Sequence, residues 1–134
     1  MGAIKGNSQV GGILGNTNRN GFSMSANVAL NPDVNSIWGG IDGYGRIAFN
    51  TNTMTSMSSL YARNDMTFTL AGVTSLATSG TTGNLNGANV SAGPAGYNGQ
   101  AFWSGLGWDF TQGTGVWEWS AAKQLPILRG LGGQ

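Results

Sequence analysis

The sequence predicts an all-β protein, a short parallel β-solenoid of about three to four stacked coils with a tryptophan-rich C-terminal cap. The first observation behind this prediction is the composition. Glycine contributes 24 of the 134 residues, charged residues only 8% and hydrophobic residues 40%, and the formal net charge is +1. Disordered chains usually combine high net charge with few hydrophobic residues, so a folded β protein is favoured over disorder or a flexible linker. The other two observations are an internal repeat and a cluster of tryptophans.

Residues 2–34 are expected to form short strands joined by tight turns. Small apolar clusters alternate there with Gly and Asn, and no stripe with a 3.6-residue period lasts long enough for a helix. Gly and Asn both tolerate the positive φ angles that tight turns require. The segment therefore favours strands of about four or five residues.

An internal repeat follows from comparing the chain with itself. Residues 12–17, GILGNT, align with residues 46–51, RIAFNT, at an offset of 34 positions. Residues 28–31, VALN, align with residues 61–64, YARN, at an offset of 33. A period of this length is typical of stacked repeat proteins. Coincidence in a Gly- and Asn-rich sequence is the alternative explanation.

Between and after the two copies the sequence predicts a loop and a strand. Residues 35–44 contain Trp38 and Gly-rich turn pairs, which indicate a loop that projects from the repeat. Residues 65–76 alternate cleanly and indicate a half-buried strand. Its two faces carry different residues: Met66, Phe68 and Leu70 on one, Thr67 and Thr69 on the other.

The remaining residues complete a single predicted domain, 1–134. Repeat coils are expected over 2–76 and a Gly-rich connection over 77–100, with a short strand near 88–90. The cap is expected over 101–129, which holds four of the five tryptophans: Trp103, Trp108, Trp117 and Trp119. Aromatic rings bury the most apolar surface per residue, and a solenoid needs its last coil covered. The segment is therefore interpreted as a lid.

Several of these segments resemble the GLUG repeat, whose pattern is close to VGGLVGxN. The resemblance is carried by residues 2–7, GAIKGN, and 10–16, VGGILGN, together with NVALNP and LYARNDM further on. The later runs GWDF, VWEW and LPILR resemble the ending of such arrays in large bacterial surface proteins. The resemblance implies a β-solenoid in an exported, surface-attached or secreted protein of the adhesin-like kind.

The second copy departs from the family pattern, because Arg46 and Phe49 stand where the family has Gly. The chain also begins inside a repeat, so the resemblance implies the C-terminal end of a longer array. Upstream repeats or a second copy are then the expected partners, and a glycan or host-surface ligand is a further one. The expected location is extracellular or at the cell surface.

The residue types present exclude most catalytic chemistry. The chain has no His and no Cys, which removes the Ser-His-Asp triad, thiolate chemistry and disulfides. The acids show no spacing that pairs two of them as a glycosidase needs, and they are too sparse for calcium: Asp33, Asp42, Asp65, Asp109 and Glu118. No phosphate-binding glycine motif is present. We therefore expect no catalysis, no metal and no cofactor.

Charge and hydropathy also limit the partners. The six basic residues are spread along the chain without a patch, so nucleic acid binding is not expected. No run approaches the ~18 apolar residues of a membrane helix, so membrane insertion is not expected either. The function predicted is a non-catalytic structural or adhesion module that self-associates into a fibre.

A carbohydrate-binding module is the alternative function, because exposed aromatic rings can stack on sugars. Four residues are the candidates for that contact: Trp38, Tyr44, Tyr97 and Trp103. For the rings between 103 and 119, covering the last coil is the favoured interpretation. For Trp38 the two interpretations are equally supported.

Overall fold

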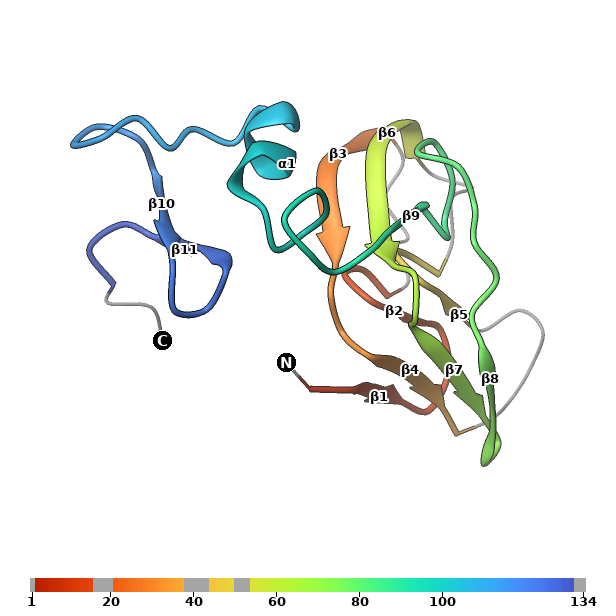
Figure 1. Ribbon diagram of the computed structural model, residues 1–134. Coiled ribbons are helices and arrows are strands. Elements are labelled where there is room, and N and C mark those ends of the chain that lie inside the picture. The colour runs from red at the N-terminus through yellow and green to blue at the C-terminus, as the bar shows by residue number, and fades with distance from the viewer. Residues whose placement is uncertain (1, 16–20, 38–43, 50–53, 132–134) are drawn as a thin grey trace. The chain divides into compact units, whose positions relative to one another are not determined.

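A computed structural model of the chain describes residues 2–15, 21–37, 44–49 and 54–131. The chain divides into two compact units, Met1–Val90 (unit 1) and Ser91–Gln134 (unit 2) (Figure 1). The boundary lies inside the segment predicted as a connection. The regular structure of the described residues consists of strands and a single short helix. The all-β prediction is therefore confirmed.

The regular elements of unit 1 are all strands, within its described residues. They are β1 (Ile4–Gly6), β2 (Val10–Gly11), β3 (Phe22–Ala29), β4 (Asp33–Ser36), β5 (Tyr44–Gly45), β6 (Met54–Arg63), β7 (Thr67–Leu70), β8 (Val73–Leu76) and β9 (Ala88–Val90). Three sheets result, with the strand orders β1-β4-β7-β8, β2-β5 and β3-β6-β9. All their pairings are parallel except that of β7 with β8.

The chain visits the three sheets repeatedly in the same order. A first pass places β1, β2 and β3, and a second pass places β4, β5 and β6 beside them. Leu14 pairs with Ala48, which is its counterpart in the first alignment made from the sequence. Ala29 pairs with Ala62, its counterpart in the second alignment. Both alignments are therefore confirmed as parallel strand partners.

The sheets nevertheless differ from the continuous parallel solenoid that the sequence predicts. They are small and separate, and two of the four sheets among the described residues have two strands each. One of the three in unit 1 ends in an antiparallel strand, β8. The sheets establish an all-β fold in which most strand pairings are parallel.

Each long strand bends at the same point. Ala26 in β3 and Ser59 in β6 both have left-handed backbone angles, with φ of 54° and 52°. A left-handed conformation costs a residue with a Cβ roughly 1–2 kcal/mol. The register places the two side by side, since Ser25 pairs with Ser58 and Asn27 with Leu60. The bend is therefore a property of the repeat and is present in both passes.

Glycine is required where the two passes turn sharply. A Cβ on Gly11 would lie 2.0 Å from the carbonyl oxygen of Leu14, and one on Gly45 would lie 1.9 Å from that of Ala48. Gly11 and Gly45 are register partners. The structural role predicted for the glycine pair at 11–12 is thus confirmed at Gly11 and recurs one pass later.

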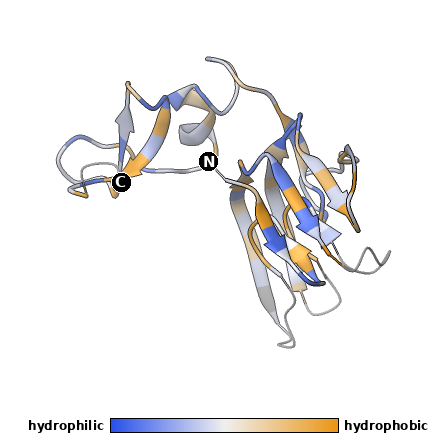
Figure 2. Cartoon of the chain, turned by 90° about the horizontal axis from the view of Figure 1, so that it is seen from below, coloured by the Kyte–Doolittle hydropathy of each residue, from blue (hydrophilic) through white to orange (hydrophobic). Residues whose placement is uncertain are grey.

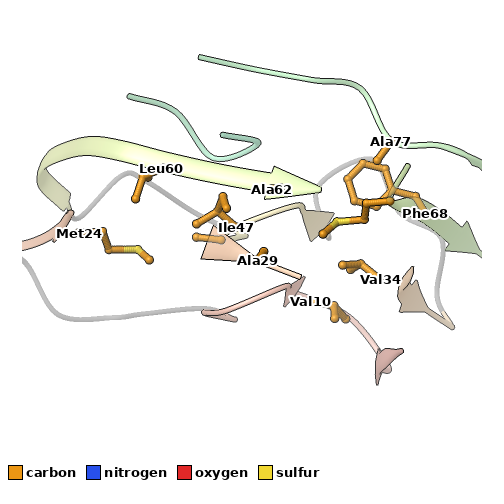
Figure 3. Close-up of a cluster of buried hydrophobic side chains, with 11 residues drawn as sticks. Val10, Met24, Ala29, Val34, Ile47, Leu60, Ala62, Phe68 and Ala77 are labelled. Atoms are coloured by element: carbon orange, nitrogen blue, oxygen red, sulfur yellow. The ribbon is translucent and has the colours of Figure 1, made fainter. Parts of the chain in front are cut away.

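The core of unit 1 lies between the sheets. Figure 3 shows side chains from several strands pointing into one cluster. Its most buried members are fully inaccessible: Val34, Ile47, Ala48, Leu60, Ala62 and Met66. Along the strands, apolar and polar residues follow each other in short stretches (Figure 2). This patterning places one face of strands such as β4 and β7 in the core.

Residues 65–76 form a hairpin instead of the single predicted strand. Ala71 and Gly72, with φ of 47° and 85°, make a two-residue turn between β7 and β8. Positive φ at both central residues suits the twist of paired antiparallel strands. The predicted inner face is confirmed for Met66 and Phe68, which are buried.

Residues 77–87 form no strand, but their backbone carbonyls accept hydrogen bonds from the second pass. The backbone N–H groups of Ile47 and Ala48 donate to the carbonyl of Leu85, and that of Leu60 donates to Thr82. Strand β9 pairs with β6, as the short strand expected near 88–90. With β7 beside β4, residues 67–90 occupy backbone groups along the far side of the second pass.

Unit 2 contains α1 (Gln100–Gly105) and an antiparallel hairpin of β10 (Trp117–Ser120) and β11 (Leu125–Leu128). The sequence predicts β11 as an extended piece but does not predict the helix. Arg129 holds the hairpin to the preceding loop. Its Nε donates to the carbonyl of Gly115 at 2.6 Å, and its Nη2 donates to Thr111 and Trp117 at 3.0 Å each.

Candidate functional site

The two sides of the stacked passes in unit 1 differ. The second pass is covered by residues 67–90, whereas β1, β2 and β3 stand at the ends of their sheets. On their outer sides, no strand among the described residues pairs with them. We call this side the first-pass edge.

The first-pass edge also exposes apolar side chains. Ile13 is 43% exposed, while Ile47, its equivalent in the second pass, is 0% exposed. Ile4 is partly buried, while its strand partner Val34 is 0% exposed. The same positions thus become buried as soon as another pass lies beside them. An uncovered strand edge with apolar side chains is a surface suited to strand pairing.

One group of backbone hydrogen bonds recurs from pass to pass. The N–H groups of Ile13 and Leu14 donate to the carbonyl of Ile47, as those of Ile47 and Ala48 donate to Leu85. In the first pass the equivalent acceptor is the carbonyl of Ile13. No backbone N–H of the described ranges donates to it. The first-pass edge therefore presents an acceptor where a further pass would supply donors.

The outer face of the β1-β4-β7-β8 sheet carries a polar group of side chains. Asp33 accepts hydrogen bonds from the hydroxyls of Thr67 and Thr69 at 2.8 and 3.0 Å. The hydroxyl of Thr69 is in turn 2.9 Å from that of Thr74. These contacts tie β4, β7 and β8 together, so Asp33 has a structural role.

The predicted sugar-stacking residues that the structure describes belong to two units, Tyr44 to unit 1 and Tyr97 and Trp103 to unit 2. Tyr97 and Trp103 are buried, 6% and 3% exposed, so the prediction is wrong for both. The indole N–H of Trp103 donates to the carbonyl of Tyr97 at 2.8 Å, which holds the ring inside unit 2. Tyr44 is half-buried against Phe68, with ring centroids 4.6 Å apart. Trp38 lies outside the described residues.

The aromatic rings of unit 2 pack on one another. Trp108 lies between Trp103 and Trp117, with centroid distances of 4.7 and 4.1 Å, and the second pair is stacked. Phe110 and Trp119 meet edge to face at 6.4 Å. Trp117 and Trp119 are both partly buried. The rings form the core of a small unit, and their placement over the last pass of unit 1 stays a prediction.

The described carboxylates are engaged separately. Asp65 accepts from Nε and Nη2 of Arg63 at 2.5 and 2.6 Å, and this contact holds the pKa of Asp65 below its ordinary value. Hydrogen bonds from Thr111 likewise lower the pKa of Asp109. Glu118 lies 4.0 Å from Arg129. No group of three acidic, His or Cys side chains that could hold a metal occurs in the described part of the chain.

Replacing Asp65 with asparagine tests the ion pair with Arg63. The variant is expected to lose up to about 1 kcal/mol of unfolding free energy at neutral pH, because the pair is largely exposed. A lowered native pKa stabilises the fold above the unfolded pKa, about 3.9, and the effect disappears as pH falls through the native pKa. Urea unfolding of both proteins at about pH 7 and pH 2 measures it. An equal difference at both pH values would contradict the assignment.

Arg46 is the one described cation enclosed in the core of unit 1. It is 1% exposed, and burial lowers the pKa of its guanidinium. Nη2 donates to the carbonyls of Ala62 and Arg63 at 2.7 and 2.8 Å. Nε and Nη1 have no partner among the described residues. Arg46 thus ties the second-pass turn to the end of β6.

The chain matches no protein-family model, no curated protein and no solved structure. In the described residues, no helix has the length and apolar character needed to span a membrane. The first-pass edge is therefore the feature on which a functional proposal rests.

Sequence reasoning missed part of this arrangement. It did not predict that residues 77–90 contact the second pass, although Asn84 and Gly87 mark a turn there. The side-chain oxygen of Asn84 accepts from the N–H groups of Asn86 and Gly87. Gly87 has a φ of 63°. An Asn-Leu-Asn-Gly turn before a short strand was the available signal.

Proposed function

We propose that the chain is a non-catalytic structural module of an extracellular or cell-surface protein, which acts in adhesion or in a fibre by stacking further passes on its first-pass edge. One observation carries the proposal. Ile13 is 43% exposed at that edge, and its equivalent Ile47 is 0% exposed one pass further on. The partner that fits is a pass of the same geometry, from preceding repeats or from a second copy.

The register supports this partner. Parallel pairing at a nearly constant offset already joins the first two passes, as in the pairs Val10 with Tyr44 and Ala29 with Ala62. A stacked repeat protein is stabilised by contacts between neighbouring repeats, so another pass in the same register would gain the same contacts. The likeness of residues 10–16 to the GLUG repeat, seen in bacterial surface proteins, supports the location and the adhesive role.

Sugar binding is supported less well, since two of its four candidate residues are buried. A glycan array with the wild-type chain tests this alternative. Binding that depends on Trp38, and that survives loss of the first-pass contact, would favour it over the structural role.

Replacing Ile13 with lysine is expected to prevent assembly through the first-pass edge. Lysine on a strand edge opposes pairing with another strand, and the change removes an exposed apolar side chain. Light scattering of the wild-type chain is expected to show concentration-dependent growth in mass beyond that of a dimer, and Ile13→Lys is expected to stop growth beyond a dimer. Circular dichroism should show the same strand content in both proteins.

Ile37→Lys is the matched control, because Ile37 is the same residue type, is 47% exposed and follows β4 of the second pass. It is expected to assemble as the wild type does. A wild-type chain that stays monomeric at high concentration with native strand content would count against the proposal. So would equal loss of assembly in both lysine variants.

A further inference from the structure

A second uncovered edge lies on the opposite side of the β1-β4-β7-β8 sheet. Strand β8 ends that sheet, and all four of its residues are exposed. Val73 and Leu76 are the most exposed large apolar side chains of the described residues, at 71% and 68%. Proteins usually protect such an edge with a charge, a proline or a bulge. Strand β1, at the other edge of the sheet, carries Lys5, whereas β8 carries no such residue.

The hydrogen-bond pattern shows which backbone groups of β8 face outward. The N–H of Ala77 donates to the carbonyl of Met66 at 2.9 Å. Residue 67 lies opposite Leu76, and residue 69 lies opposite Thr74. Because hydrogen-bonded and non-hydrogen-bonded pairs alternate in an antiparallel ladder, the N–H and C=O groups of Thr74 and Leu76 point away from β7. The outer edge of β8 therefore offers both of these residues for pairing with another strand.

We propose that β8 pairs antiparallel with β8 of a second copy of the chain, around a twofold axis. The two four-stranded sheets would then become one continuous sheet across the contact. A twofold contact places the same surface on both partners and closes without growing further. An antiparallel neighbour also continues the antiparallel pairing that β8 already makes with β7.

The charge distribution favours a second copy over a different partner. No charged residue lies between Asp65 and Asp109, so the whole sequence around β8 is neutral. Two copies therefore meet without like-charge repulsion, and a charged partner finds no complementary group on this strand. The exposed Leu76 side chains would also lose contact with water on pairing, which favours association.

Sedimentation of the Ile13→Lys variant tests this contact separately from the proposed function, because that variant lacks the first-pass contact. It is expected to form a dimer in a concentration-dependent manner. Adding Leu76→Lys is expected to raise the dimer Kd by about tenfold or more, since two lysines would face each other and the buried leucines would be lost. Adding Thr74→Pro, which removes an outward N–H, should weaken the dimer as well.

Ala121→Lys is the matched control, since it adds the same charge at an exposed turn of unit 2. It is expected to leave the Kd unchanged. An Ile13→Lys chain that stays monomeric up to about 1 mM would overturn the proposal. So would a Kd that is the same with Leu76→Lys as with Ala121→Lys. Either result leaves the first-pass edge untouched as the basis of the proposed function.

Discussion

Replacing Gly45 with alanine is expected to lower the free energy of unfolding of unit 1 by about 3 kcal/mol or more. The new Cβ would lie 1.9 Å from the carbonyl oxygen of Ala48, a backbone atom. That backbone cannot move freely, because the N–H groups of Ile47 and Ala48 are both bonded to Leu85. Urea unfolding followed by circular dichroism measures the loss.

The register gives this prediction an internal comparison. Gly11→Ala meets the same obstacle one pass earlier, with the carbonyl oxygen of Leu14 at 2.0 Å, so a loss of similar size is expected. Gly2→Ala meets nothing within 4 Å and should change the stability by less than about 0.5 kcal/mol. A Gly45→Ala chain as stable as the Gly2→Ala chain would show that the turn is built differently.

Replacing Trp103 with alanine is expected to unfold unit 2. Truncating a buried tryptophan costs about 3–5 kcal/mol. Trp103 contacts the rings of Phe102 and Trp108 and donates its indole N–H to Tyr97. A unit as short as Ser91–Gln134 is close to the size of about 40 residues below which domains rarely fold without extra support. Near-ultraviolet circular dichroism and tryptophan fluorescence report the loss of its ring packing.

The strands of unit 1 should survive this change, because the core cluster of unit 1 includes no described residue beyond Leu85. Far-ultraviolet circular dichroism then retains the β signal. Val116→Ala, at a side chain that is 62% exposed, serves as the control and should leave the ring signals intact. Retention of those signals in Trp103→Ala would refute a core role for the ring.

The register between the first two passes could be predicted from the sequence. The motifs GILGNT and RIAFNT align because each contains residues that must occupy equivalent places, such as Leu14 and Ala48. The inner face of β7 could also be predicted, since alternation in a strand reports burial directly. Both predictions rest on short sequence patterns, and parallel pairing of the strands preserves these patterns.

Other features depend on contacts that no local pattern contains. The alternation over residues 65–76 is typical of a single strand, so it does not indicate the hairpin turn at Ala71 and Gly72. Tyr97 and Trp103 resemble exposed binding residues in sequence, and only their packing in unit 2 buries them. The contact of residues 77–90 with the second pass depends on backbone carbonyls such as that of Leu85, which composition does not reveal.

The shared register also limits how a chain of this kind can change in length. A single residue inserted in a strand would reverse which side chains face the core, as a one-residue slip does in any sheet. Insertion or loss of a whole pass would instead return every later residue to an equivalent neighbour, as Ala29 and Ala62 already are. Duplication of complete passes is thus the change in chain length that disturbs this architecture least.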